Sequence, residues 1–291
     1  MDVTADELNR RFSADGRIVF REGPGGDPIA VLLAPQGVCE VSVYGGHLLS
    51  YRAKGFQDTL WMSPLAEFVQ GKAIRGGIPV CWPWFGKPFD GMPEGTYTHG
   101  FARRSLWSVA ATEYSSSETV LVLELTEATA THPAWPYRYH LQLTVTLGDC
   151  LTLDLQTRNL DNRPFTYSEC FHAYLRVADI RKVGVYGVED GPIAFSDDIP
   201  HDRIYPKADI LAAVKDPVMD RAIGIAADDT GAVVVWNPSL KHSMGDVPLD
   251  GSRHFVCVEP ANPHQVDAAV TLDPGEAHTM TLRLQPTVLK H

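Results

Sequence analysis

Two residues that can exchange protons, His172 and Glu259, lie in strand-like stretches far apart in the chain. His172 lies in YSECFHAYLRVADI, where a strand would place it on one face with Cys170 and Tyr174. Glu259 ends the apolar run HFVCVEP, and the proline that follows favours extended backbone at the glutamate. A histidine and a carboxylate are common general acids and bases. Each also has a structural explanation, a buried histidine or a solvated strand end, so their pairing is a hypothesis.

Positively charged side chains gather around the segment QGKAIRGGIP. Arg75 can donate two parallel hydrogen bonds to an anion such as phosphate, and Lys72 is a second charge nearby. The glycines that follow Arg75 would let the backbone approach a ligand closely. Solvation at the surface is the alternative explanation for many of these side chains. Further candidates are Arg52, Lys54, His99, Arg103 and Arg104.

The cysteines form no CxxC pair, and each lies in an apolar or strand-like stretch. We expect reduced, buried thiols, with a nucleophilic Cys170 as the alternative. A metal site built from His99, His172 and Glu259 is a further alternative, because these side chains suit zinc or manganese. The sequence has no HxH or HExxH spacing, so we predict neither a metal nor another cofactor. The five cysteines are Cys39, Cys81, Cys150, Cys170 and Cys257.

Composition and charge exclude several classes of protein. Lys and Arg number 25 and Asp and Glu number 36, giving a net charge of −11, which argues against nucleic acid or an anionic membrane as a partner. The start, MDVTADELNRRF, lacks a signal-peptide pattern, and no run of about 18 apolar residues occurs. No repeat or linker divides the chain. We therefore expect a soluble, cytoplasmic monomer with one domain spanning residues 1–291.

The elements that must position the candidate residues are mostly strands. Apolar and polar residues alternate over 141–147 and 151–155, on either side of Gly148-Asp149, which is typical of a β-hairpin. One short helix is expected over 5–12. With 24 Gly and 21 Pro between short apolar runs, the pattern predicts an all-β fold of antiparallel sheets. The same alternation recurs over 120–125, 233–236, 254–259 and 280–284.

The segment 72–99 is an unusual connection because it combines a glycine pair, several prolines and clustered aromatic residues. Trp82, Trp84 and Phe85 would expose a large apolar area if they packed on nothing. We therefore predict an ordered loop that lines a pocket, with a plain surface connection as the alternative.

Several of these segments, taken in order, resemble the aldose 1-epimerase superfamily, and within it the hexose-6-phosphate mutarotase branch. The resemblance covers most of the chain, and its most specific parts are KAIRGGIPVCWPWFG and HGFARRSLW. It implies a galactose-mutarotase-like β-supersandwich. Weaker matches are GGHLLSYRA, LWMSPLAEF, ECFHAYLRVADI, VVWNP and HFVCVEPAN.

The resemblance also implies roles for single residues. His172 would be the acid that protonates the ring oxygen of an aldohexose, and Glu259 the base at its anomeric hydroxyl. The ring then opens and recloses as the other anomer. Positions implied to bind sugar hydroxyls or phosphate are Gln70, Arg75, His99 and Asp197, with Arg52 and Arg103 as further phosphate contacts.

The expected activity is therefore the interconversion of the α and β anomers of an aldohexose 6-phosphate. Departures from the family pattern leave the sugar open, since HAYL stands where HTYF is more usual and CWPWFG replaces a proline-phenylalanine form. Such positions shape the pocket and leave the proton transfers intact. A neutral-hexose mutarotase and a non-catalytic carbohydrate-binding or sensing module remain the alternatives.

Overall fold

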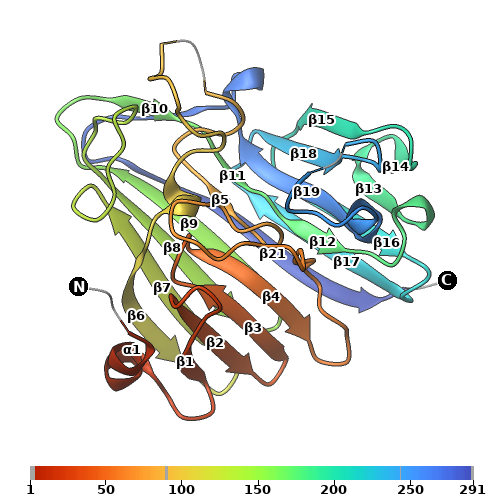
Figure 1. The fold of residues 1–291 in the computed structure, drawn as a ribbon, viewed down its shortest axis with the longest axis horizontal. Helices are drawn as coiled ribbons and strands as arrows, with labels where there is room; N and C mark the ends of the chain where they lie inside the picture. Colours follow the sequence, from red (N-terminus) through yellow and green to blue (C-terminus); the bar gives the residue numbers. More distant parts are fainter. Residues whose placement is uncertain (1–3, 89–90, 243, 290–291) are drawn as a thin grey trace.

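A nine-stranded antiparallel sheet forms the largest part of the computed structural model, which describes residues 4–88, 91–242 and 244–289 (Figure 1). Its strand order is β14-β13-β16-β17-β21-β9-β8-β7-β6. The expectation of an all-β fold built from antiparallel sheets is confirmed. The strands are β6 (Ser108–Tyr114), β7 (Thr119–Thr126), β8 (Tyr139–Leu147), β9 (Leu151–Asn159), β13 (Gly184–Glu189), β14 (Gly191–Ile193), β16 (Ile210–Asp216), β17 (Arg221–Asp228) and β21 (Ala277–Val288).

The middle of this sheet follows the alternation of the sequence. In β7, β8 and β9, every second residue is buried and the residues between are mostly half-buried, because successive side chains of a strand point to opposite faces. The predicted hairpin is confirmed, with Leu147 opposite Leu151 across the turn. The apolar face of the sheet therefore has one register, and a one-residue shift would move its leucines out of the core.

A four-stranded sheet packs against that apolar face and is drawn in red to orange in front of β7 and β8 in Figure 1. Its strands are β1 (Ile18–Glu22), β2 (Pro28–Ala34), β3 (Gly37–Ser42) and β4 (His47–Ala53). The expected helix, α1 (Ala5–Phe12), is confirmed. It begins where the hydroxyl of Thr4 accepts a hydrogen bond from the Glu7 amide, and it buries Leu8.

A six-stranded sheet carries the candidate residues. Its central strand, β19, is buried at every position, since β18 lies on one side of it and β11 and β12 lie on the other. The strands are β5 (Val80–Cys81), β11 (Glu169–Phe171), β12 (Tyr174–Arg176), β15 (His201–Pro206), β18 (Ala232–Asn237) and β19 (Phe255–Asn262). The remaining elements are the pair β10 (Phe165–Tyr167) and β20 (Val270–Leu272), and the 3₁₀ turns η1 (Ala102–Arg104), η2 (Ile180–Lys182), η3 (Gly251–His254) and η4 (His264–Val266).

One apolar core joins these layers, with members from Leu8 in α1 to Leu284 in β21. That residues 1–291 form one domain stays a prediction, which this shared core supports. Within the described ranges, the structure has no helix that is both long enough and apolar enough to cross a membrane.

Most of the residues from 74 to 85 in the segment 72–99 are buried in the core, whereas most of those from 91 to 98 are exposed; residues 89 and 90 lie outside the described residues. Trp82 and Trp84 are fully buried, and Phe85 is nearly so. Trp82 packs edge-on against Phe101 and Trp135, at ring distances of 5.7 and 5.5 Å. The interpretation as a plain surface connection is therefore wrong. The two tryptophans serve the core, whereas Phe85 packs beside His99 at a ring distance of 5.1 Å.

Candidate active site

A two-residue gap between β11 and β12 positions His172. Both strands pair with β19, one beside Ala261 and the other beside Cys257, so the gap lies alongside the middle of β19. Backbone hydrogen bonds to the segment before β5 replace the missing ladder: the His172 amide donates to Pro79 at 3.1 Å, and the Tyr174 amide donates to the carbonyl of residue 77 at 2.9 Å. The interruption therefore has firm anchors on both sides of His172.

His172 and Glu259 meet in the interior. Nδ1 of His172 lies 3.2 Å from Oε1 of Glu259, and the two residues are 7% and 1% exposed. The angle between the two groups is not that of an aligned hydrogen bond, so within the described residues Nδ1 has no such partner. The alternative explanation of Glu259 as a solvated strand end is wrong, because β19 continues through Pro260 to Asn262. The fold thus brings together the two proton-exchanging groups that the sequence singled out.

Burial moves the pKa values of the two groups in opposite directions. The pKa of His172 lies well below its usual value because of burial, reinforced by the positive charges of Arg103 and Arg75. The pKa of Glu259 lies well above its usual value because burial outweighs the hydrogen bond from Cys170. Two buried groups shifted in this way favour a state without net charge, in which the pair holds a single proton.

Thiols surround the Glu259 carboxylate. Sγ of Cys170 donates to Oε2 at 3.3 Å, on the side away from His172. Cys257 lies two residues before Glu259 and therefore on the same face of β19. The prediction of reduced, buried thiols is confirmed for four of the five cysteines, and Cys150 is half-buried. Burial raises the pKa of Cys170 well above its usual value, which weakens the alternative of a nucleophilic thiolate.

Three rings enclose the imidazole of His172. Tyr174 stacks on it at 4.7 Å with the ring planes 6° apart. Trp236 in β18 meets it edge-on at 5.7 Å, and His99 does so at 5.6 Å. The φ angle of His99 is 60°, and its backbone amide donates to Gly86 at 2.8 Å, which holds this ring in place. These contacts fix the plane of the imidazole before any ligand arrives.

A basic hollow of about 240 Å³ lies on the far side of Tyr174. Four cations and two anions line it, which leaves an excess of two positive charges in a chain whose net charge is −11. Such a local reversal of sign favours an anionic ligand. The cations are Lys72, Arg75, Arg103 and Arg104, and the anions are Glu67 and Asp246.

Arg75 connects the hollow to the acid-base pair. Its Nε donates to Oδ2 of Asp246 at 2.9 Å, and one terminal nitrogen donates to the Tyr174 hydroxyl at 2.7 Å. Tyr174 in turn stacks on His172. No sequence pattern pointed to Asp246, which lies 171 residues from Arg75 in the chain. Tyr174 was noticed only as a residue that would share a face with His172.

The arginines after His99 also line the hollow. Arg103 in η1 is 8% exposed and donates to the carbonyl of Thr98 at 3.0 Å. The guanidinium of Arg104 lies 4.2 Å from the centre of the Tyr97 ring and also donates to the carbonyl of residue 71. Lys72 is ion-paired with Glu67 at the rim. The hollow is thus built mainly from the segments 67–75 and 98–104, and Tyr174 and Asp246 complete it.

Comparison with known proteins agrees with this geometry. The profile of the aldose 1-epimerase family matches residues 31–209 and 190–285. The chain belongs to the aldose 1-epimerase family. It is 34% identical, over 243 residues, to an Escherichia coli K12 protein named as a candidate glucose-6-phosphate 1-epimerase, covering 78% of this chain and 80% of that protein. A similarly named protein of the plant Cenchrus ciliaris is 31% identical over 282 residues, covering 87% and 83% of the two chains.

Solved structures show the same fold. A candidate mutarotase from Salmonella typhimurium superposes with a TM-score of 0.85 at 27% identity, and the match covers 96% of each chain. A galactose mutarotase-like protein from Clostridium acetobutylicum gives a TM-score of 0.71 at 14% identity, covering 94% of this chain and 99% of that one. The expected galactose-mutarotase-like architecture is therefore confirmed.

Four of the six positions implied to bind substrate do not line the basic hollow, and one of them, His99, packs against His172 instead. Gln70 is exposed and donates to Asp27 at 2.9 Å. Arg52 is exposed near the end of β4, in register with Val38. Asp197 forms ion pairs with two arginines, Arg253 at 2.7 Å and Arg181 at 3.3 Å. These partners lower the pKa of Asp197, with the hydrogen bond from Arg253 as the largest cause.

The glycines after Arg75 serve packing. A side chain at Gly76 would lie 2.5 Å from the carbonyl of Trp61, and one at Gly77 would lie 2.2 Å from the carbonyl of Leu48. Both have positive φ angles, 103° and 61°. Packing against the backbone of Trp61 and Leu48 is thus enough to require glycine at both positions, and the expected close approach to a ligand stays a prediction. They allow the Arg75 segment to lie directly on β4.

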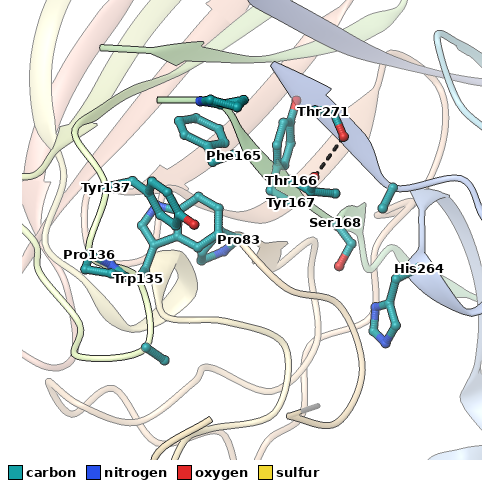
Figure 2. Close-up of a pocket in the computed structure, with 13 residues that line it drawn as sticks. Pro83, Trp135, Pro136, Tyr137, Phe165, Thr166, Tyr167, Ser168, His264 and Thr271 are labelled. Carbon is teal, nitrogen blue, oxygen red and sulfur yellow. Dashed lines mark hydrogen bonds between the residues drawn. The ribbon is translucent and has the colours of Figure 1, made fainter. Parts of the chain in front are cut away.

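The largest cavity is a different place, shown in Figure 2. It has a volume of about 640 Å³, and its lining includes Trp135, Tyr137, Phe165 and Tyr167 but no carboxylate among the described residues. A further hollow of about 380 Å³ lies beyond Trp236. Size alone would favour the aromatic cavity as a ligand site. Proton exchange at a sugar ring needs both an acid and a base. The His172 region supplies both beside a hollow with excess positive charge, whereas the hollow beyond Trp236 is lined by Asp202 and Arg203, whose charges cancel.

Proposed function

We propose that this chain interconverts the α and β anomers of an aldohexose 6-phosphate by opening and reclosing the sugar ring. The observation that carries the proposal is the buried contact between His172 and Glu259, one aromatic ring away from a hollow with excess positive charge. The names of the Escherichia coli and Cenchrus ciliaris relatives support the same substrate class.

The pair holds a single proton, which suits a reaction in which the sugar has no net gain or loss of protons. In the charged form, His172 is protonated and Glu259 is ionised, so the imidazolium can protonate the ring oxygen while the carboxylate takes the proton of the anomeric hydroxyl. Ring opening leaves a neutral imidazole and a protonated carboxyl, which is the form that burial favours in the empty site. After rotation about the bond between C1 and C2, the reverse transfers close the ring as the other anomer. Each positioned transfer contributes about 10² to 10⁴ in rate.

The 6-phosphate is the finer part of the proposal. Arg75 is held by Asp246 and Tyr174, so its orientation is fixed before binding, and Arg103 and Arg104 also line the hollow. Guanidinium groups bind phosphate through parallel hydrogen bonds. A neutral hexose would gain nothing from the two excess charges. The basic hollow therefore favours the phosphorylated sugar over the neutral-hexose alternative.

The place of each other candidate side chain in the structure indicates whether it can contact the substrate. We propose Arg75, Arg103 and His99 as contacts available in the present conformation. Gln70 and Asp197 would first have to release Asp27 and Arg253, while Arg52 would need a ligand that extends beyond the basic hollow. We also propose a cytoplasmic monomer. One chain supplies every group that the reaction uses, and its free thiols suit a reducing compartment.

The test is anomer exchange followed by NMR on glucose 6-phosphate, galactose 6-phosphate and the two free sugars. We expect the protein to accelerate exchange of a hexose 6-phosphate far more than exchange of the free sugar. Equal acceleration of free sugars would remove the phosphate from the proposal. If every exchange rate stays at its uncatalysed value, the enzymatic proposal itself fails, and a binding or sensing role takes its place.

A pair of arginine variants sharpens this test. Arg103→Gln should raise KM for the phosphorylated sugar and leave exchange of the free sugar unchanged, because it removes one charge from the hollow. Arg10→Gln is the matched control, since Arg10 is an exposed residue of α1. Loss of activity on both sugars in Arg103→Gln would indicate a role at the acid-base pair, on which the charge of Arg103 also acts.

A further inference from the structure

Three different metal-binding side chains meet at the acid-base pair. One ligand atom each from His172, Cys257 and Glu259 lies within 4.8 Å of the others. All three residues are more than nine-tenths buried, at 7%, 0% and 1% exposure. Nδ1 of His172 has no aligned hydrogen-bond partner among the described residues, so this nitrogen is available to bind a metal ion.

The backbone fixes this arrangement from two sides. Cys257 and Glu259 alternate on one face of β19, while the gap between β11 and β12 delivers His172 to the same face. Tyr174, stacked on His172 and paired with Cys257 across the strands, holds the imidazole near the thiol. The metal alternative weighed from the sequence named His99 in place of Cys257. The structure assigns the third ligand to the thiol.

A thiolate, an imidazole and a carboxylate together suit Zn²⁺, which binds sulfur, nitrogen and oxygen in tetrahedral sites. Mg²⁺ and Ca²⁺ prefer sites built from oxygen alone. With three ligands from the protein, a fourth position stays open to water or to a sugar hydroxyl.

We propose that Zn²⁺ binds between Nδ1 of His172, Sγ of Cys257 and a carboxylate oxygen of Glu259, and thereby inhibits the enzyme. The inhibition rests on the proposed function, whereas the binding does not. A bound ion would occupy the imidazole nitrogen and the carboxylate oxygen between which the proton of the pair is held. It acts as a reversible blocker of the site, and removing it leaves activity intact.

The binding step balances as a proton exchange. Burial raises the pKa of Cys257 well above its usual value, so without the ion the residue is a thiol. Binding breaks the S–H bond of Cys257 and the O–H bond of the protonated Glu259 carboxyl, forms bonds from zinc to sulfur, oxygen and the imidazole nitrogen, and releases two protons to solvent. No change of oxidation state takes part. His172 is the most exposed of the three residues, so the ion approaches from its side.

Cys170 is the competing sulfur. Its thiol lies 3.3 Å from the other carboxylate oxygen of Glu259, yet it is not part of the group whose ligand atoms lie within 4.8 Å of one another. A variant at each cysteine therefore tells which sulfur binds the ion. Cys150, half-buried beside Thr152 at 3.6 Å, supplies a matched control far from the pair in sequence.

The experiment uses Co²⁺ as a spectroscopic probe in the absence of sugar. Wild type, Cys150→Ser and Cys170→Ser should develop a near-ultraviolet band of charge transfer from thiolate to cobalt, which Zn²⁺ abolishes and excess Mg²⁺ does not. Cys257→Ser should lack the band. Absence of the band in wild type, its persistence in Cys257→Ser, or its loss in Cys170→Ser would overturn the assignment. Circular dichroism checks that each variant is folded.

If Cys257→Ser does not fold, Glu259→Gln decides the matter. This variant keeps the Cys257 thiol and the shape of the residue 259 side chain but removes the charged ligand. Loss of a residue that only hydrogen-bonds to a metal ligand typically lowers metal affinity by about 10- to 100-fold. We therefore expect the Co²⁺ affinity to fall at least about tenfold. Unchanged affinity would contradict the site.

Zinc inhibition is then measured against the zinc-free rate of each variant. The half-inhibitory concentration should rise at least about tenfold in Cys257→Ser relative to Cys150→Ser. If the wild-type protein shows the cobalt band but no mutarotation, the proposed function is contradicted and the metal site is supported. Mutarotation without the band would do the reverse, so the two failures are distinguishable.

Discussion

The nine-stranded sheet and the six-stranded sheet of this protein are built by different rules. In β8, buried and half-buried residues alternate along all nine positions, and both neighbouring strands pair without interruption. In the six-stranded sheet, β19 is buried at every position, and the strand beside it breaks into β11 and β12. The first sheet is a regular support, and the second gives up regularity where His172 meets Glu259.

The difference indicates where stability and chemistry reside. Alternating leucines bury apolar surface with few polar groups, which stabilises a fold at little electrostatic cost. The centre of the six-stranded sheet buries a histidine, two acidic side chains and three thiols, and burial of ionisable groups costs free energy. Variants in the two sheets should therefore have opposite effects on activity and stability.

The largest effect should come from the pair itself. His172→Ala and Glu259→Gln should each lower kcat by about 10² to 10⁴, because each removes one of the two proton transfers. Anomer exchange by NMR measures the loss, and circular dichroism should show an unchanged sheet content. Activity within a factor of ten of wild type in either variant would place the acid or the base elsewhere.

A cavity in the regular sheet should have the opposite effect. Leu155→Ala in β9 removes a fully buried side chain and should lower the free energy of unfolding by about 2 to 5 kcal/mol. The kcat of the folded fraction should not change. Leu211→Ala is the matched control, because Leu211 is 76% exposed, and chemical denaturation should detect almost no effect. Equal losses at the two positions would show that β9 is not the stabilising layer described here.

The contrast also explains what the sequence could predict. The hairpin at Leu147 and Leu151 follows from alternation, because each strand buries one face. The continuation of β19 beyond Glu259 could not be predicted in this way, since a strand buried on both faces has no period. The apolar run ends at Glu259, which made a strand end there an alternative. The partners that bury it, β18 and β11, come from distant parts of the chain.

The residues of the site also differ in whether the sequence could predict them. His172 and Glu259 were found because acids and bases of these types are rare within apolar runs, and family resemblance assigned their roles. Asp246 and Cys257 gave no such signal. Asp246 matters only because Arg75 lies 2.9 Å from it, and Cys257 only because the break in the neighbouring strand brings an imidazole to its side. Such roles depend on tertiary contacts that no local pattern encodes.

Glu259→Gln should also reveal what the buried acid costs. The pKa of Glu259 is raised in the fold, so above its usual value of 4.5 the unfolded chain ionises and the folded chain resists ionisation. Wild-type stability therefore falls as the pH rises above this value, whereas a glutamine at position 259 does not titrate and causes no such loss. We expect Glu259→Gln to be more stable than wild type at neutral pH. Thermal unfolding from pH 4 to 8 tests this, and a stability gap that shrinks with rising pH would contradict it.

The smallest effect should come from Cys170, which tunes the base without touching the sugar. Its S–H group donates to Glu259 and lowers the pKa of that carboxyl. Cys170→Ala should move the alkaline limb of the pH–rate profile upward by less than about one unit, because one neutral hydrogen bond is worth about 1 kcal/mol. Cys170→Ser keeps a donor and should restore the wild-type profile. Identical shifts in both variants would indicate a change of packing.

The break between β11 and β12 has an evolutionary consequence. The backbone amides of residues 172 and 174 donate to the carbonyls of residues 79 and 77, so the segment that carries Arg75 also completes the sheet that carries His172. A substitution that shifts the backbone of one segment therefore also shifts the other. Lineages that adapt to a new sugar are therefore expected to change both segments in step, or to leave both untouched and vary the loops around them.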